Sequence, residues 1–305
     1  MYRGRPMNSI TIGLTTRLPL RRIRAMTCRQ PGRHQVRHSV IAWQKSKLRV
    51  ITLERSSSLS IECPEDFEGL AQAGQVVAAT LKAMERTVRA GVTTAEVDRV
   101  GELALTRYGA TSAPRETYGF PGVNLISVND EIVHGIPGNR VLEQGDLVSL
   151  DVTAELNGYI ADAAITIPIP PCSAKAARLC QCARAAFEKA VAVARANKPI
   201  NCIGHAVEHE VKRQGFWVVS ELTGHGIGRV IHEDPIVANT YNPLDSKPLW
   251  NGLVITIEPL IAEHPARAVE GLDGWTMKTS DGSLSAHFEH TVVITDGRPI
   301  LLTAA

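Results

Sequence analysis

The chain has 305 residues, 44% of them hydrophobic and 21% charged, which is ordinary globular composition and enough chain for a substantial buried core. No apolar run reaches the roughly 18–20 residues that a bilayer span needs, so we expect no membrane partner. The six cysteines form no C-x-x-C pair, which argues against a disulfide scaffold or a thiolate zinc site and favours a reducing compartment.

The net charge of +2 hides an uneven distribution of charge along the chain. Residues 1–53 contain 12 of the 33 lysines and arginines, and all 31 acidic residues lie at Glu54 or beyond it. We therefore expect a basic N-terminal extension over residues 1–58 and one folded domain over residues 59–305. The extension is a transit peptide, a stretch upstream of a later start such as Met26, or a disordered basic arm that contacts RNA; the sequence leaves all three open.

The folded part begins with two expected helices. Pro64 stands in the first turn of a helix with an apolar stripe, and Gly91 marks its expected end. Thr93 and Glu96 form a capping-box pattern, which predicts a second helix to about Tyr108.

Strands and two further helices follow. Strand-like runs cover residues 123–129, 147–153 and 159–169, helices are expected at 173–197 and 202–214, and strand signals return at 216–222, 253–260, 274–279 and 287–294. This order indicates an α+β fold, with two related halves around one core as one arrangement.

Asn157-Gly158 predicts a tight hairpin turn between the strands at 147–153 and 159–169, because both residues tolerate positive φ. With that turn, Asp151 and Asp162 become diagonal neighbours on one face, with Cβ atoms about 7–8 Å apart or less. Two carboxylates in this apolar setting suit a divalent cation, and two exposed acids on a wet sheet face are the alternative that this pair alone leaves open.

Three more residues extend this pair. Glu258 and Glu289 also lie in apolar strand-like runs, and His225 stands between Gly224 and Gly226, where the backbone can approach closely. Four carboxylates and one imidazole suit two divalent ions with open coordination positions. His134 and His232 remain as neutral polar groups near such a centre.

Six motifs follow one another in the chain: VHGIP (133–137), LDVT (150–153), GHGIGRVIHEDP (224–235), TIEPL (256–260), DGWTMKT (273–279) and SLSAHFEHT (283–291). Together they resemble the type I methionine aminopeptidases, from about residue 62 to the C-terminus. The resemblance implies an α+β pita-bread fold of the creatinase/aminopeptidase kind, with two pseudo-symmetric halves around an antiparallel sheet. It also implies a two-metal hydrolase that removes the initiator methionine from nascent proteins and peptides.

The resemblance assigns roles to single residues. It implies two divalent ions (Co²⁺, Mn²⁺, Fe²⁺ or Zn²⁺), with Asp162 and Glu289 as the bridging ligands, and the full ligand set is Asp151, Asp162, His225, Glu258 and Glu289. His134 and His232 are expected to contact the scissile peptide and stabilise its tetrahedral intermediate. Asn129 and Ser285 match positions that hold a monovalent cation in relatives.

These roles are chemically coherent. Two cations that share a water lower its pKa, and Glu258 can accept the proton and pass it towards the leaving amine. His232, with His134 nearby, can donate hydrogen bonds to the developing oxyanion, and one such donor is typically worth about 3 kcal/mol.

The expected substrate side-chain pocket departs from the family pattern. Thr117 stands where a tyrosine is common and Leu125 takes a usual cysteine position, whereas Phe120 keeps an aromatic position. Ile231 and Trp275 are expected to complete the walls. The preference for methionine is therefore less firmly predicted than hydrolysis, since one methylene changes discrimination only about 10–200-fold.

Other histidines have simpler interpretations. His205 and His209 match H-x-x-E-H, but the helical period turns both away from the apolar face, so we expect them to face solvent. His287 shares a strand face with Glu289 and has no motif role.

Two other functions compete with methionyl aminopeptidase: an Xaa-Pro aminopeptidase-like enzyme, and a non-catalytic binding module on the same fold. Nascent polypeptide N-termini are the expected partner, with ribosome contact through the basic extension as a further possibility. We expect a monomer that binds no DNA. The cytoplasm is the expected compartment, and a mitochondrion or plastid is the alternative if residues 1–53 are a transit peptide.

Overall fold

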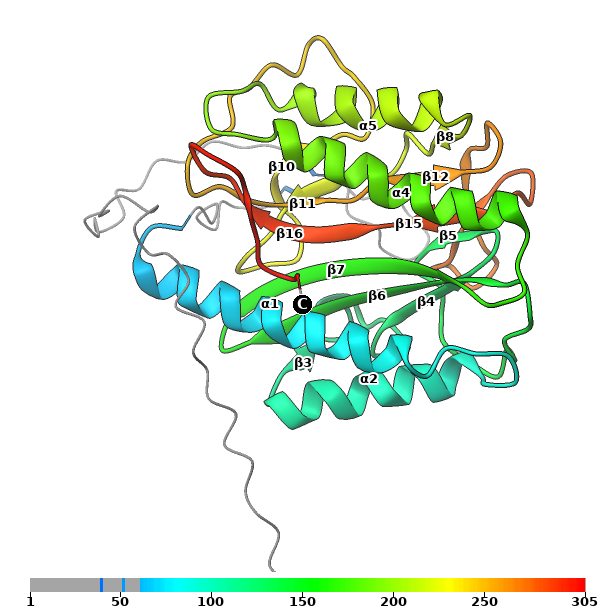
Figure 1. Cartoon of the computed structure of the whole chain (residues 1–305). Coiled ribbons are helices and arrows are strands. Elements are labelled where there is room, and N and C mark those ends of the chain that lie inside the picture. The colour runs from blue at the N-terminus through cyan, green and yellow to red at the C-terminus, as the bar shows by residue number, and fades with distance from the viewer. Residues whose placement is uncertain (1–38, 41–50, 53–60, 305) are drawn as a thin grey trace, which may run out of the picture.

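Figure 1 shows the computed structural model of the chain, which describes residues 39–40, 51–52 and 61–304. The expected extension 1–58 lies outside the described residues, apart from β1 (Ser39–Val40) and β2 (Ile51–Thr52), which pair antiparallel. The proposed boundary between residues 58 and 59 therefore stays a prediction. None of the described helices is both long and apolar enough to cross a bilayer.

Two N-terminal helices begin where the sequence predicts. Helix α1 (Pro64–Glu85) has Pro64 in its first turn, and α2 (Thr94–Tyr108) starts with the Thr93–Glu96 capping box and stops at Gly109, whose φ is 71°. Helix α1 ends before Gly91, because the chain there already turns to pair with a later loop: the amides of Gly91 and Leu142 donate to the carbonyls of Leu142 and Val92. A short helix, α3 (Ala113–Tyr118), was not expected.

A nine-stranded antiparallel sheet forms the centre of the domain. Its main path runs in the order β10 (Glu233–Val237), β9 (Gly224–Gly226), β11 (Val254–Ile257), β16 (Glu289–Val293), β7 (Tyr159–Pro168), β6 (Leu147–Leu156) and β3 (Thr111–Ser112). Strand β4 (Leu125–Val128) also pairs with β6, and β17 (Ile300–Leu301) with β16.

Two three-stranded sheets accompany it. One has the order β15 (Ser285–His287), β12 (Leu260–Ala262) and β8 (Trp217–Val218). The other has the order β13 (Ala268–Glu270), β14 (Met277–Thr279) and β5 (Glu131–Val133).

The helices divide the domain into two halves, as Figure 1 shows. Helix α1 packs against β6 and β7 with α2 beside it, whereas α4 (Ala174–Val193) packs against β11, β12 and β15 with α5 (Asn201–Arg213) beside it. Each half has its own buried cluster, with Leu81, Met84 and Val97 in the first and with Phe187 and Ile203 in the second. The expected α+β arrangement in two halves around an antiparallel sheet is confirmed.

The β6–β7 hairpin has the predicted register. Asn157 and Gly158 have φ values of 53° and 80°, as a type I′ turn requires. Asp151 pairs with Ala164, and Thr153 pairs with Asp162. Asp151 and Asp162 are therefore diagonal neighbours in the middle of the sheet.

Candidate metal centre and active site

Neighbouring strands bring the five candidate ligands together. Asp151 lies on β6, Asp162 on β7 and Glu289 on β16, where Glu289 pairs with Ala164 of β7. Glu258 directly follows β11, and His225 is the middle residue of β9. Because β9, β11, β16, β7 and β6 are consecutive in the sheet, residues spread along the chain meet at one place.

All five side chains are buried. The exposed fraction ranges from 2% for Glu289 to 9% for His225. Burial raises the pKa of Glu258 to about 8 and that of Asp162 to about 6. Burial, together with the neighbouring carboxylates, also raises the pKa of Asp151 and Glu289 well above their ordinary values. Four ionised carboxylates are therefore unfavourable here unless positive charge compensates them.

Carboxylate oxygens without a hydrogen-bond partner indicate what kind of positive charge this cluster can bind. Asp151 Oδ1, Asp162 Oδ1 and Glu289 Oε1 are buried and have no hydrogen-bond partner. Ligand atoms of Asp162, His225 and Glu289 all lie within 4.8 Å of one another, and so do ligand atoms of Asp151, His287 and Glu289. Glu289 belongs to both groups. Carboxylate oxygens with an imidazole nitrogen are a donor set that suits divalent ions, so the side chains present fit a metal.

His225 is held in the orientation of a metal ligand. Its Nδ1 is 2.9 Å from the carbonyl oxygen of Gly226, so Nδ1–H donates there and Nε2 keeps a free lone pair. That Nε2 lies 3.6 Å from Glu258 Oε1. The Thr256 hydroxyl joins the two residues, because it accepts from the His225 amide and donates to Glu258 Oε1 at 2.7 Å.

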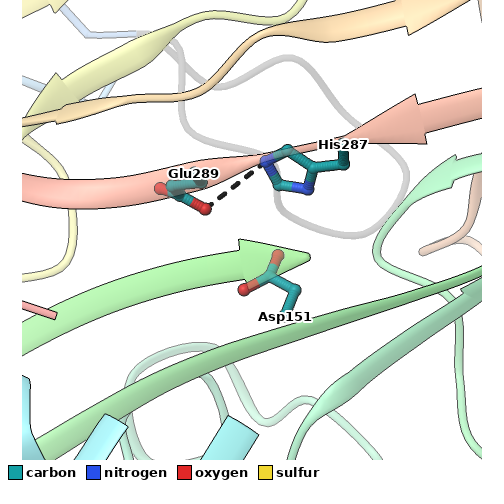
Figure 2. Close-up of side chains that lie close together, drawn as sticks. All are labelled: Asp151, His287 and Glu289. Atoms are coloured by element: carbon teal, nitrogen blue, oxygen red, sulfur yellow. Dashed lines mark ion pairs between the residues drawn. The ribbon is translucent and has the colours of Figure 1, made fainter. Parts of the chain in front are cut away.

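His287 also belongs to this cluster, which the sequence analysis did not anticipate. Figure 2 shows its imidazole and the Glu289 carboxylate pointing toward each other, with the Asp151 carboxylate facing them from β6. Burial lowers the pKa of His287 to about 3, so the ring is neutral. A signal existed: His287 and Glu289 are two residues apart in an extended segment, the spacing that puts side chains on one face.

The two histidines expected to contact the substrate, His232 and His134, are close enough to the cluster to interact electrostatically with its histidines. The ring centroid of His232 is 4.3 Å from that of His225, and its Nδ1 is 2.6 Å from the hydroxyl of Tyr118. His232 is exposed as a residue, yet desolvation by the surrounding protein lowers its pKa to about 4. His134 is half-buried, and burial together with nearby His232 lowers its pKa to about 4. Both rings are therefore neutral at pH 7.

Comparison with known proteins identifies the family. The sequence matches metallopeptidase family M24 over residues 68–296. The chain belongs to metallopeptidase family M24. It is 45% identical to methionine aminopeptidase 2 of Bacillus subtilis over 241 residues, which cover 78% of this chain and 97% of that protein.

Solved structures agree with this assignment. The methionine aminopeptidase of Thermotoga maritima superposes with a TM-score of 0.78 at 33% identity, covering 80% of this chain and 99% of that one. A prolidase from Pyrococcus furiosus superposes with a TM-score of 0.66 at 24% identity, covering 81% of this chain and 66% of the prolidase; this second likeness shows the shared fold alone. The M24 chain thus has the pita-bread fold, and the family supplies a metallopeptidase activity that matches the buried ligand cluster.

Only some of the residues expected to line the side-chain pocket of this metallopeptidase touch one another. Phe120 and Trp275 meet edge to face, with centroids 5.3 Å apart. Leu125 is buried and pairs with Asp151 in the sheet, so it lies next to the ligand cluster. Ile231 is buried among apolar side chains of the core, and Thr117 is exposed on α3. Their contact with substrate stays a prediction.

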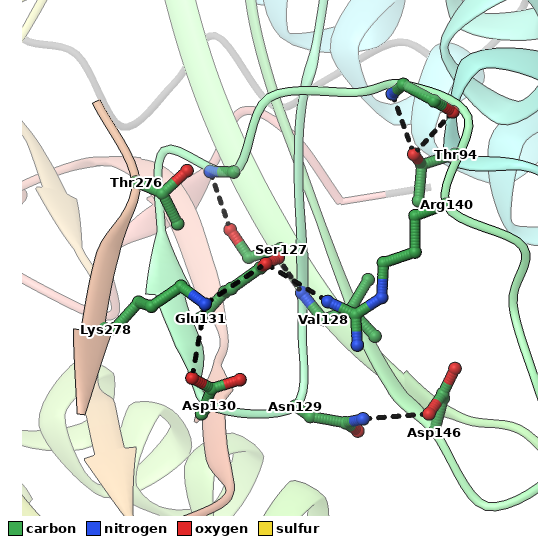
Figure 3. Close-up of polar contacts among 12 residues, drawn as sticks. Thr94, Ser127, Val128, Asn129, Asp130, Glu131, Arg140, Asp146, Thr276 and Lys278 are labelled. Atoms are coloured by element: carbon green, nitrogen blue, oxygen red, sulfur yellow. Dashed lines mark hydrogen bonds and ion pairs between the residues drawn. The ribbon is translucent and has the colours of Figure 1, made fainter. Parts of the chain in front are cut away.

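Polar contacts hold the segment that carries His134 (Figure 3). The Gly135 amide donates to Ser127 Oγ at 3.0 Å, and Glu131 forms an ion pair of 3.1 Å with Arg140. Nearby, the Asn129 side-chain amide donates to Asp146, and the backbone carbonyl of Asn129 accepts from the Ser285 hydroxyl at 3.0 Å. These bonds bring Asn129 and Ser285 together, and the monovalent cation expected there stays a prediction.

Two further expectations concern α5. His205 and His209 are both exposed there and stack with ring centroids 6.3 Å apart. They face solvent as the helical period predicted.

Proposed function

We propose that this metallopeptidase removes the initiator methionine from nascent proteins and peptides. The observation that carries the proposal is the pair of three-residue ligand groups that share Glu289, in a chain that aligns with a methionine aminopeptidase over 97% of that relative's length. The basic extension as a ribosome contact, the cytoplasmic compartment and the monomeric state remain predictions.

Asp151, Asp162, His225, Glu258 and Glu289 would hold two divalent ions, with Asp162 and Glu289 between them. When bound, such ions lower the pKa of a shared water and polarise the scissile carbonyl. The four carboxylates would then be balanced by the charge of two divalent cations, which removes the repulsion that raises their pKa in the protein alone.

Glu258 is the group best placed to move a proton. The Thr256 hydroxyl donates a 2.7 Å hydrogen bond to its Oε1, which orients the carboxylate within the cluster. A carboxyl of this kind can take a proton from the attacking water and deliver it to the departing amine. Exchange of Glu258 therefore removes both a ligand and the proton carrier.

His232 and His134 would stabilise the negative charge that develops on the carbonyl oxygen. If the Tyr118 hydroxyl donates to Nδ1 of neutral His232, the ring proton sits on Nε2, from which it can be donated to the oxyanion. Loss of one donor of this kind costs about 10²–10³ in kcat. His134, also neutral, would act with it through its own N–H.

A peptide assay tests the proposal on the full chain. Metal-stripped protein is supplied with single divalent ions and offered Met-Ala-Ser or an Ala-Pro peptide. We expect methionine release that depends on added metal, little cleavage of the Ala-Pro peptide, and loss of at least about a hundredfold in kcat/KM for Asp162→Asn and His225→Ala. His209→Gln, which changes an exposed imidazole on α5, is the matched control and should retain full activity.

Three results would count against this function. Cleavage of the Ala-Pro peptide alone would favour an Xaa-Pro aminopeptidase, and no cleavage with any ion would favour a non-catalytic binding module. Full activity of His225→Ala would refute the assigned ligand set.

A further inference from the structure

We propose that His287 is a sixth metal ligand, which gives a nitrogen to the divalent ion on the Asp151 side of Glu289. This inference rests on the two-ion site of the proposed function and adds a side chain that the motif analysis left without a role. Each of the two ions would then have one imidazole ligand, His225 for one ion and His287 for the other.

The first observation is that His287 is aimed into the cluster without any hydrogen bond to account for it. Its side chain is 1% exposed, and neither Nδ1 nor Nε2 has a hydrogen-bond partner. A buried polar group without a hydrogen-bond partner destabilises the fold, so its position calls for another partner. Its position is nevertheless fixed, because the Thr166 hydroxyl accepts from the His287 amide and donates to the His287 carbonyl, each at 2.8 Å.

The second observation is the spacing of the atoms around Nε2. It lies 3.4 Å from Glu289 Oε2 and 4.0 Å from Glu258 Oε2, and the ligand atoms of Asp151, His287 and Glu289 all lie within 4.8 Å of one another. Nitrogen and oxygen ligands bind such ions at about 2.1 Å, so two ligands of one ion are about 3 Å apart at right angles and about 4.2 Å apart on opposite sides. The separation of 3.4 Å fits two ligands of one ion.

The third observation is the symmetry between the two ligand groups. Asp162, His225 and Glu289 form one group, and Asp151, His287 and Glu289 form the other. Each group has one histidine, one aspartate of the β6–β7 hairpin and the shared glutamate. Figure 2 shows the second group with its three side chains converging from β6, β15 and β16.

A nitrogen on the Asp151 side has a consequence for metal choice. Sites with imidazole favour later first-row ions, whereas all-oxygen sites suit Mn²⁺ and Mg²⁺. We therefore expect the metal site on the Asp151 side to bind Co²⁺ or Zn²⁺ distinctly more tightly than Mn²⁺. This preference should shrink when His287 is replaced.

The experiment measures binding rather than activity. Full-length protein is stripped of metal and titrated with CoCl₂ by calorimetry. Proton NMR of the Co²⁺-loaded protein in water then records the paramagnetically shifted N–H signals of coordinated imidazoles, which ¹⁵N-histidine labelling identifies. The variants are His287→Gln, which keeps a polar side chain of similar reach, and His209→Gln, a matched exchange at an exposed position.

We expect wild type to show one shifted imidazole signal from His225 and a second from His287. His287→Gln should lose the second signal and bind one of the two ions at least about tenfold more weakly, while His209→Gln matches wild type. A wild-type spectrum with the His225 signal alone overturns the inference even if His287→Gln fails to fold, and so does a folded His287→Gln protein that binds both ions as tightly as wild type. In either case methionine release by wild type would leave the proposed function standing. A wild type that binds no ion would refute the proposed function itself.

Discussion

Replacing Gly226 with alanine should disrupt the site without touching any proposed ligand. Gly226 lies between two strands, pairing with Glu233 of β10 and Ile255 of β11. A Cβ on Gly226 would stand 2.2 Å from the Asp234 carbonyl oxygen and 2.7 Å from its carbon. Because the obstacle is backbone, relief requires that β9 and β10 move apart.

The expected size of the effect follows from that clash. Overpacking a tight site costs about 1–3 kcal/mol, and in a domain of this size 1 kcal/mol lowers Tm by about 2–4 °C. We therefore expect Gly226→Ala to lower Tm by about 2–12 °C. The carbonyl of Gly226 also accepts the hydrogen bond that orients His225, so metal affinity should fall with stability.

Thermal unfolding and Co²⁺ titration of two variants test this reasoning. Gly138→Ala is the matched control, because a Cβ there meets nothing within 4 Å and the backbone is outside the positive-φ region. We expect it to remain within about 0.5 kcal/mol of wild type. If Gly226→Ala unfolds and binds metal as Gly138→Ala does, the close approach of β9 to β10 does not hold His225 in place.

Three further predictions concern other contacts. Tyr118→Phe removes the hydroxyl that bonds His232 Nδ1 and keeps the ring, so steady-state kinetics should show kcat lower by about tenfold with KM little changed; an equal rise in KM would argue for lost binding instead. Chelation should lower Tm measurably, because saturation at about 100 times Kd stabilises a protein by about 2.7 kcal/mol, and an unchanged Tm would show that no ion had been bound. Burial alone would raise the pKa of the Asp66 carboxyl, but hydrogen bonds from Glu62 and Cys63 outweigh it, and the pKa lies below its ordinary value of 3.8. The ionised carboxylate therefore stabilises the folded protein above pH 3.8, and this stabilisation is lost as pH falls through the folded pKa. Urea unfolding of Asp66→Asn should accordingly show a deficit of about 1–3 kcal/mol at pH 7 that narrows below pH 4, and a deficit independent of pH would contradict this assignment.

Local chemistry made part of the site predictable from the sequence. The Asn157-Gly158 turn fixes the hairpin register, and strand alternation then places Asp151 and Asp162 on one face. The glycines beside His225 were also informative, since a Cβ on Gly224 would stand 2.6 Å from the Thr256 carbonyl oxygen. A turn that acts within a few residues is determined by the sequence alone, whereas the glycines indicate a close backbone approach without showing which segment makes it.

Other features depend on contacts between distant segments. The strand β9 has three residues, too few for alternation to be visible, and it exists because β10 and β11 pair with it. Helix α1 ends at Glu85 rather than near Gly91 because residues 91–92 pair with Leu142. Tyr118 and His232 are 114 positions apart in the chain, so no local sequence pattern could predict their contact.

The position of the ligands in the sheet explains how the chain tolerates so many buried acids. Side chains on paired strands are held by ladders of backbone hydrogen bonds, so the four carboxylates cannot swing apart to relieve their repulsion. Burial of apolar side chains stabilises the fold and so offsets the cost of holding the carboxylates together. Each half of the domain contributes one large apolar cluster to this burial. Carboxylate oxygens that are held rigidly and have no hydrogen-bond partner can bind cations with little rearrangement. The same oxygens on a flexible loop would instead accept hydrogen bonds from nearby donors and lose this advantage. The same rigidity means that a side chain such as His287, once placed among the carboxylates, must either coordinate or remain unmatched.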